Sequence, residues 1–177
     1  MDLFKKHEGT LRKAIEALHS RTFFAAFPEH PAPAVYGENA DADGQKKFKE
    51  RLGKKFEDLL QANPEGWAGD EESPYLQERL NVQYPLFPVA ALMERSKKAF
   101  HQWRKISQAE RAGMLLESLD GVKSRFFEIA YATMHTTGQG YMMAFQASGP
   151  HAADRALEAI AAAYEELQRF PSKALWD

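Results

Sequence analysis

The scarcity of β-branched residues is the sequence feature that most restricts the fold of this chain. Its 177 residues include only four valines, four isoleucines and five threonines, against 27 alanines and 16 leucines. β-Branched side chains favour strands, whereas Ala, Leu, Glu, Lys and Gln lose the least on entering a helix. We therefore expect an all-α fold, an irregular bundle with at most a short strand near residues 80–84.

Prolines mark the boundaries of the expected helices. Nine prolines stand between segments whose interiors contain none, as expected of a residue that breaks helices. Each of these segments carries apolar residues near helical spacing, and the chain length suits a single domain. We expect about five helices, at residues 2–20, 41–60, 88–103, 107–137 and 151–169.

The expected helices fall into three segments of one structural domain. Residues 1–40 hold the first helix and a proline-rich connection, and residues 41–88 hold the second helix and a long irregular connection. Residues 89–177 hold the last three helices, whose apolar stripes are the clearest. We expect these three helices to form the structural core, because matching stripes bury one another.

The expected helix at residues 107–137 carries the strongest signals. It opens with a capping box, Ser107-Gln108-Ala109-Glu110, in which the serine hydroxyl accepts a backbone N–H bond and the glutamate reaches back. Phe127, Tyr131 and Met134 form a second apolar stripe beside its main one. One neighbouring layer cannot cover both stripes, so we expect exposed apolar surface here, through which the chain could form a homodimer.

The residue types that usually carry catalysis or bind metals are missing or badly spaced. No cysteine is present, which excludes a thiolate nucleophile, and the six histidines never stand three to five residues apart as metal ligands on a helix do. The turn Gly138-Gln139-Gly140 follows a helix, and Met143 stands where a dinucleotide fingerprint has its third glycine. We expect no catalytic, cofactor-binding or metal site on this chain itself.

Charge and hydropathy argue against two classes of partner. The 23 basic and 25 acidic residues give a net charge of −2, so no overall basic field attracts nucleic acid. A basic run at residues 46–55 lies mostly opposite the apolar stripe of its helix, which indicates a solvated face. No segment approaches the roughly 20 apolar residues of a membrane span. We expect a cytoplasmic protein with no nucleic-acid or membrane partner.

The second half of the chain carries a series of features in a fixed order. An expected helix ends at Trp103, a break with Ser107 and Glu110-Arg111 follows, and a leucine-rich helix then leads to the turn Thr137-Gly138-Gln139. In this order the features resemble the N-terminal helical region of the aldehyde dehydrogenase superfamily, with Gln139 in place of the usual lysine of a Thr-Gly-Lys turn.

Two earlier segments are similar to one subfamily, the phenylacetic acid degradation proteins (PaaN). They are residues 30–37, His-Pro-Ala-Pro-Ala-Val-Tyr-Gly, and residues 81–85, Asn-Val-Gln-Tyr-Pro. With them the resemblance covers nearly the whole chain. It implies a longer enzyme that oxidises a CoA-linked semialdehyde of phenylacetate catabolism with NAD or NADP, by thiolate attack, hydride transfer and thioester hydrolysis.

The resemblance implies that this chain is a non-catalytic scaffold whose partner is the remainder of its own enzyme. The catalytic cysteine, general-base glutamate and cofactor contacts of the family lie further along, and none is carried over here. The helix after the Thr-Gly-Lys turn runs beside the substrate tunnel in the family. His151 and Arg155 are therefore candidates for the tunnel wall, with solvent-exposed helix surface as the alternative.

A stand-alone helical module that binds other proteins is the alternative function. Amphipathic helices with excess apolar surface also describe a partner-binding bundle. The two hypotheses differ in whether the parent reading frame continues for several hundred residues and encodes a cysteine nucleophile.

Overall fold

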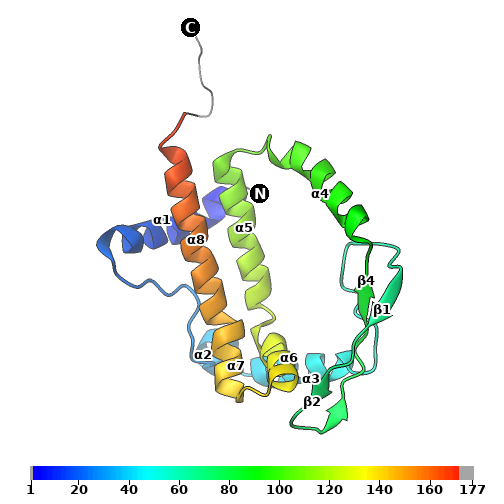
Figure 1. Ribbon diagram of the computed structural model, residues 1–177. Helices are drawn as coiled ribbons and strands as arrows, with labels where there is room; N and C mark the ends of the chain where they lie inside the picture. Colours follow the sequence, from blue (N-terminus) through cyan, green and yellow to red (C-terminus); the bar gives the residue numbers. More distant parts are fainter. Residues whose placement is uncertain (1, 172–177) are drawn as a thin grey trace.

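The computed structural model describes residues 2–171, so the predicted segment 89–177 is described only as far as residue 171. The fold is mainly helical, as predicted (Figure 1). The helices are α1 (Leu3–Ser20), α2 (Pro33–Tyr36), α3 (Ala40–Arg51), α4 (Val89–Trp103), α5 (Gln108–Lys123), α6 (Phe126–Thr137), α7 (Tyr141–Ser148) and α8 (Pro150–Gln168). The strands are β1 (Gly66–Ala68), β2 (Glu72–Ser73), β3 (Glu78–Arg79) and β4 (Tyr84–Leu86).

The predicted number of five helices is wrong, chiefly because the expected helix at residues 107–137 is two helices. The capping box of Ser107 and Glu110 starts α5 as predicted. Arg125 then leaves helical geometry, with φ −121° and ψ 7°, and α6 begins at Phe126. No proline or glycine marks this break. After the break, Phe126 and Phe127 of α6 pack in an aromatic cluster with Phe145 of α7.

The break also explains the second apolar stripe. Phe127 is only 6% exposed, and its ring lies 4.8 Å from that of Phe145 on α7. Tyr131 stacks over Phe48 of α3. Phe127 is thus covered within the chain, whereas Tyr131 and Met134 are only half-buried. The prediction that the stripe lies exposed is wrong at Phe127.

Two other helix boundaries also differ from the predicted ones. Residues 141–148, predicted only as a short apolar piece, form α7, and Ala144 and Phe145 on it are completely buried. The expected second helix ends at Arg51 instead of continuing to Leu60, and Leu60 is 99% exposed. The apolar spacing beyond Arg51 belongs to a loop whose Phe56 packs against the aromatic side of α3.

The long connection before α4 contains two small antiparallel ribbons. β1 pairs with β4, with Trp67 opposite Pro85, and β2 pairs with β3, with Glu72 opposite Arg79. The strand predicted near residues 80–84 is therefore displaced, since β4 begins only at Tyr84. Leu80 and Val82, between β3 and β4, are instead buried with Phe48.

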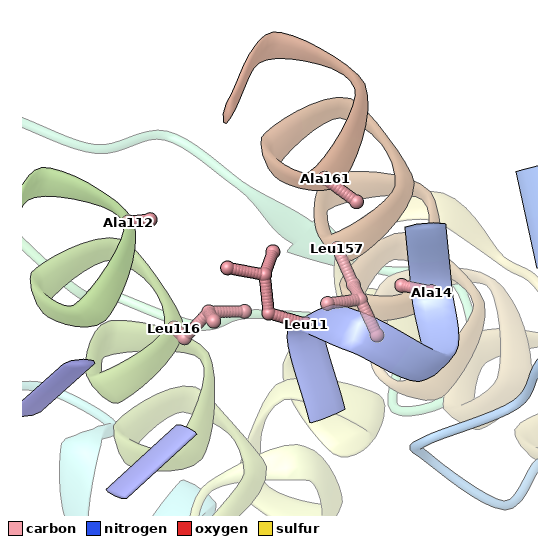
Figure 2. Close-up of a cluster of buried hydrophobic side chains, with 6 residues drawn as sticks. All are labelled: Leu11, Ala14, Ala112, Leu116, Leu157 and Ala161. Carbon is pink, nitrogen blue, oxygen red and sulfur yellow. The ribbon is translucent and has the colours of Figure 1, made fainter. Parts of the chain in front are cut away.

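The main core lies where α1 crosses α5 and α8. It consists of Leu11 and Ala14 from α1, Ala112 and Leu116 from α5, and Leu157 and Ala161 from α8. Figure 2 shows Leu11 between Leu116 and Leu157. The predicted core of the last three helices is therefore wrong in one respect: α1 takes the place expected for α4, on which no residue is buried.

A second core joins α6 to α7, α8 and the segment that follows α1. Phe126, Phe127 and Phe145 form it with Phe27 and the partly buried Tyr36. α3 crosses α6 closely at Gly44, where an added Cβ would lie 2.3 Å from Cβ of Phe127. Real side chains do not approach so closely, so only glycine allows this crossing.

We expect Leu157→Ala to lower the free energy of unfolding by about 2–5 kcal/mol, because it leaves a cavity among well-packed helices. Leu157 is 1% exposed. Leu60→Ala is the matched control, since Leu60 is almost fully exposed; it should change stability by less than about 0.5 kcal/mol. Urea unfolding followed by circular dichroism measures both. Equal midpoints for the two variants would contradict the position of the core.

We expect Gly44→Ala to destabilise the chain by about 1–3 kcal/mol, because its methyl group overpacks the contact with Phe127. Gly121→Ala on α5 is the control, since an added Cβ there meets nothing within 4 Å. That control should stabilise the chain by up to about 1 kcal/mol through helix propensity. Thermal unfolding distinguishes the two, and stabilisation by both substitutions would contradict the close crossing.

Candidate functional site

The most unusual surface of the chain is helix α4. Apart from Trp103, every residue of α4 is exposed, including Val89, Met93 and Phe100. The helix joins β4 to α5 and stands away from the α1, α5 and α8 core (Figure 1). An amphipathic helix normally gains its stability by burying its apolar face. α4 leaves that face uncovered among the described residues.

An apolar groove of about 540 Å³ lies between the helices α3, α5 and α6 and the connection that contains Phe56, Val82 and Tyr84. α3, α5 and α6 supply its walls on one side, and the residues around β4 supply the other. Its apolar lining consists of Phe48, Phe56, Val82, Tyr84, Val122, Ile129 and Ala132. A hollow of this size with few polar groups is the kind of surface that receives a ligand or a protein segment.

A closed network of charges forms the polar part of the groove. Glu128 of α6 is buried, and its two carboxylate oxygens accept hydrogen bonds from Arg51 Nε and Arg125 Nε, both at 2.9 Å. Asp58 Oδ2 pairs with the same two arginines, at 2.5 Å from Arg51 Nη2 and 3.6 Å from Arg125 Nη2. Two positive and two negative charges therefore balance here.

The network keeps Glu128 ionised despite its burial. Burial alone would raise the pKa of Glu128, but hydrogen bonds from Arg125 and Arg51 outweigh it and leave the pKa below its ordinary value of 4.5. Sequence analysis missed this network. Arg125 and Glu128 stand three residues apart, which is a recognisable helix pairing, but nothing in the sequence connects them to Arg51 on α3.

The structure places the predicted tunnel-wall residues on the outer surface of α8. His151 Nδ1 lies 3.1 Å from Oε1 of Glu29. Arg155 pairs with Glu158 at 2.7 Å and lies over the ring of Phe23. Neither residue lines the groove. Both are exposed, and a role for them in a substrate tunnel stays a prediction.

Ser73 and His135 resemble a nucleophile and base but are held as a structural pair. Ser73 Oγ lies 2.7 Å from Nδ1 of His135, and the serine is completely buried. The same oxygen accepts backbone N–H bonds from Tyr75 and Leu76. Burial lowers the pKa of His135. No substrate could reach this hydroxyl, so the pair anchors β2 to α6.

His7, Glu117 and Asp120 bring three metal-ligating groups together within 4.8 Å. Lys6 Nζ, however, lies 2.6 Å from the Glu117 carboxylate and 3.8 Å from that of Asp120. His7 Nε2 lies 2.6 Å from the same oxygen of Glu117. The lysine ammonium thus already supplies the positive charge, and the cluster acts as an ion-pair network between α1 and α5.

The glycine turn after α6 does not fit a dinucleotide. Gly138 has a φ of 78° and caps the C-terminus of α6, as its position after a helix predicts. The Tyr75 hydroxyl donates to the carbonyls of Gly138 and Gln139 at 3.1 and 2.9 Å. The turn therefore joins helix to helix and is tied to the β2–β3 ribbon, whereas a dinucleotide cradle follows a strand.

We expect Glu128→Gln to lower the free energy of unfolding by about 1–3 kcal/mol near pH 7, because two arginines lose a buried charged acceptor. The lowered pKa stabilises the fold above pH 4.5, and this stabilisation is lost as the pH falls through the native pKa. The difference from the unsubstituted chain should therefore shrink below about pH 4.

Glu94→Gln is the control for this prediction. Glu94 pairs with Lys98 on α4, but both side chains are exposed, and solvent screens such pairs so that they add little to stability. Urea unfolding at several pH values compares the two variants. A Glu128→Gln midpoint that matches that of Glu94→Gln at every pH would show that the network does not stabilise the fold.

One solved protein structure is similar to this chain in both fold and sequence. No protein family and no curated protein matches the chain, and among the described residues no helix is both long and apolar enough to cross a membrane. The crystal structure of an NAD-dependent aldehyde dehydrogenase from Burkholderia multivorans matches with a TM-score of 0.92 and 46% sequence identity. The match covers 99% of this chain and 31% of that protein. The chain is therefore similar to part of an aldehyde dehydrogenase, and it spans about a third of that protein's length.

Proposed function

We propose that this chain is the helical, non-catalytic part of an NAD(P)-dependent aldehyde dehydrogenase. The observation that carries the proposal is the 46% identity to an NAD-dependent aldehyde dehydrogenase over 99% of the chain. Such an enzyme uses a nucleophile that this chain cannot supply, since it has no cysteine. The nucleophile and the cofactor site would therefore lie in the rest of the parent protein.

The chain would serve the enzyme as scaffold. Three helices hold a continuous core, and the charged groups of the groove neutralise one another instead of converging on a reacting atom. General acid–base chemistry needs a titratable group within reach of a substrate proton. Glu128 is buried with both oxygens accepting from arginines, so it holds the groove in shape and is not free to transfer a proton.

The proposed substrate is a CoA-linked semialdehyde of phenylacetate catabolism, as in the PaaN subfamily. Support comes from the resemblance of residues 30–37 and 81–85 to this subfamily. Both segments also pack into the fold. Tyr36 of the first contacts Phe126, Phe127 and Phe145, and Val82 of the second is buried beside Phe48. These residues therefore contribute to the stability of the fold as well as to the sequence similarity.

His151 and Arg155 would lie in the wall of the substrate tunnel. They stand four residues apart and share one face of α8. A cytoplasmic location belongs to the same proposal and rests on composition alone.

The test compares the parent protein with the 177-residue chain. We expect purified parent protein to form NADH or NADPH in proportion to its concentration when an aldehyde is added, and the isolated chain to form none. A parent variant with serine in place of the cysteine nucleophile is the control, and it should lose the activity. A parent reading frame that ends at Asp177 would overturn the proposal and favour the stand-alone helical module that binds other proteins. Cofactor reduction by the isolated chain would also overturn the proposal, because the chain would then be catalytic by itself.

A further inference from the structure

A hollow of about 260 Å³ lies around the C-terminal end of α3 and has a strongly charged lining. The lining consists of Lys47, Glu50, Arg51, Lys54 and Lys55. Four cationic side chains thus surround a single carboxylate, on a chain whose overall net charge is −2. A concave surface lined by one sign of charge raises the local concentration of the opposite sign, so this hollow favours an anionic ligand.

Most of the positive charge in the hollow has no partner in the protein. Arg51 belongs to the balanced network of the apolar groove. Lys47, Lys54 and Lys55, by contrast, form no ion pair with any residue in the range 2–171 that the structure describes. Glu50 pairs with none of them either, although it stands three residues after Lys47 on α3. The three lysines therefore leave an excess of positive charge for a ligand.

The backbone and one aromatic ring hold two of these lysines in place. The Gln83 amide donates to the carbonyl of Lys54 at 2.9 Å, and Lys55 forms a β-bridge with Gln83. Nζ of Lys55 lies 4.7 Å from the ring centroid of Trp67, where the face of the ring attracts a cation. Cations that are already positioned lose less freedom when they bind an anion, which favours binding.

We propose that this lysine hollow binds the diphosphate group of a nucleotide ligand. Several ammonium groups around one hollow suit an anion with more than one negative charge, and lysine binds phosphate as a point charge. A whole drug-sized ligand is usually enclosed by a site of roughly 300–1,000 Å³. The hollow is smaller than that, so it holds the charged part of the ligand while the remainder lies outside it.

Two kinds of ligand could bring a diphosphate to the hollow. CoA carries one, together with a further phosphate on its adenosine, and CoA is the carrier of the substrate in the proposed function. A free nucleotide such as ADP carries one as well. The proposal depends on the lysines and their positions, so it can hold whether or not the parent protein oxidises a CoA-linked aldehyde.

Titration calorimetry of the parent protein with sodium pyrophosphate, ADP and CoA tests the proposal. Low ionic strength is used, because salt screens exposed charges. We expect the double substitution Lys54→Gln and Lys55→Gln to weaken the binding of pyrophosphate and of CoA or ADP by at least about tenfold, since two charge-assisted contacts are lost. No measurable pyrophosphate binding by the unsubstituted parent would overturn the proposal.

A matched double substitution separates the hollow from the general charge of α3. Lys46→Gln with Lys49→Gln removes the same number of charges from exposed positions that do not line the hollow. We expect this control to change each affinity by less than about threefold, because exposed charges outside the site are screened. Equal weakening by the two double variants would overturn the proposal, since an overall field would then attract the anions.

The ligands distinguish the possible sources of the diphosphate. A loss for CoA that exceeds the loss for ADP assigns the hollow to a CoA ester, and equal losses assign it to a nucleotide in general. A loss for pyrophosphate alone overturns the proposal, because no nucleotide then uses the hollow. A short RNA that binds the parent more tightly than either nucleotide, and loses affinity in the Lys54 and Lys55 variant, also overturns it in favour of a nucleic-acid surface.

The outcomes also separate this inference from the proposed function. A parent with dehydrogenase activity whose nucleotide affinities do not respond to the Lys54 and Lys55 substitutions overturns the lysine hollow alone. A parent without that activity whose nucleotide binding depends on the same two lysines overturns the proposed function alone.

Discussion

The packing of Leu11 against Leu116 and Leu157 is the contact on which the other elements depend. It joins α1 to α5 and α8, which lie more than a hundred residues further along the chain. Burying one large aliphatic side chain contributes about 1.5–3 kcal/mol. α7 packs on α8, α6 on α7, and α3 and β2 on α6, so these elements are positioned in turn from the same three-helix core.

Two glycines make the close helix crossings of this bundle possible. An added Cβ at Gly113 of α5 would lie 2.5 Å from the backbone nitrogen of Phe4 in α1. The crossing of α3 over α6 at Gly44 is equally tight and brings Arg51 to Glu128. The charged network of the groove thus depends on a contact between a glycine and a phenylalanine, because that contact sets the distance between the two helices.

The described part of the chain is well packed on most sides and leaves one side uncovered. The core, the aromatic cluster and the ion pairs are satisfied within the chain, whereas α4 and the groove are not. Uncovered apolar surface of this extent usually marks an interface. The aldehyde dehydrogenase that matches the chain is about three times as long as the chain itself.

The sequence by itself determined the helical class, the start of α5 at its capping box, and the bounds of α1, α4 and α8. These features depend on amino-acid composition and on the spacing of residues within one helix, and both can be read from the sequence. The tertiary structure alone decided the break at Arg125, the covering of Phe127, the pairing of Arg51 with Glu128, and the exposure of α4. Each of these depends on which distant element packs against a given face, and an apolar stripe predicts that a face is buried without indicating by what.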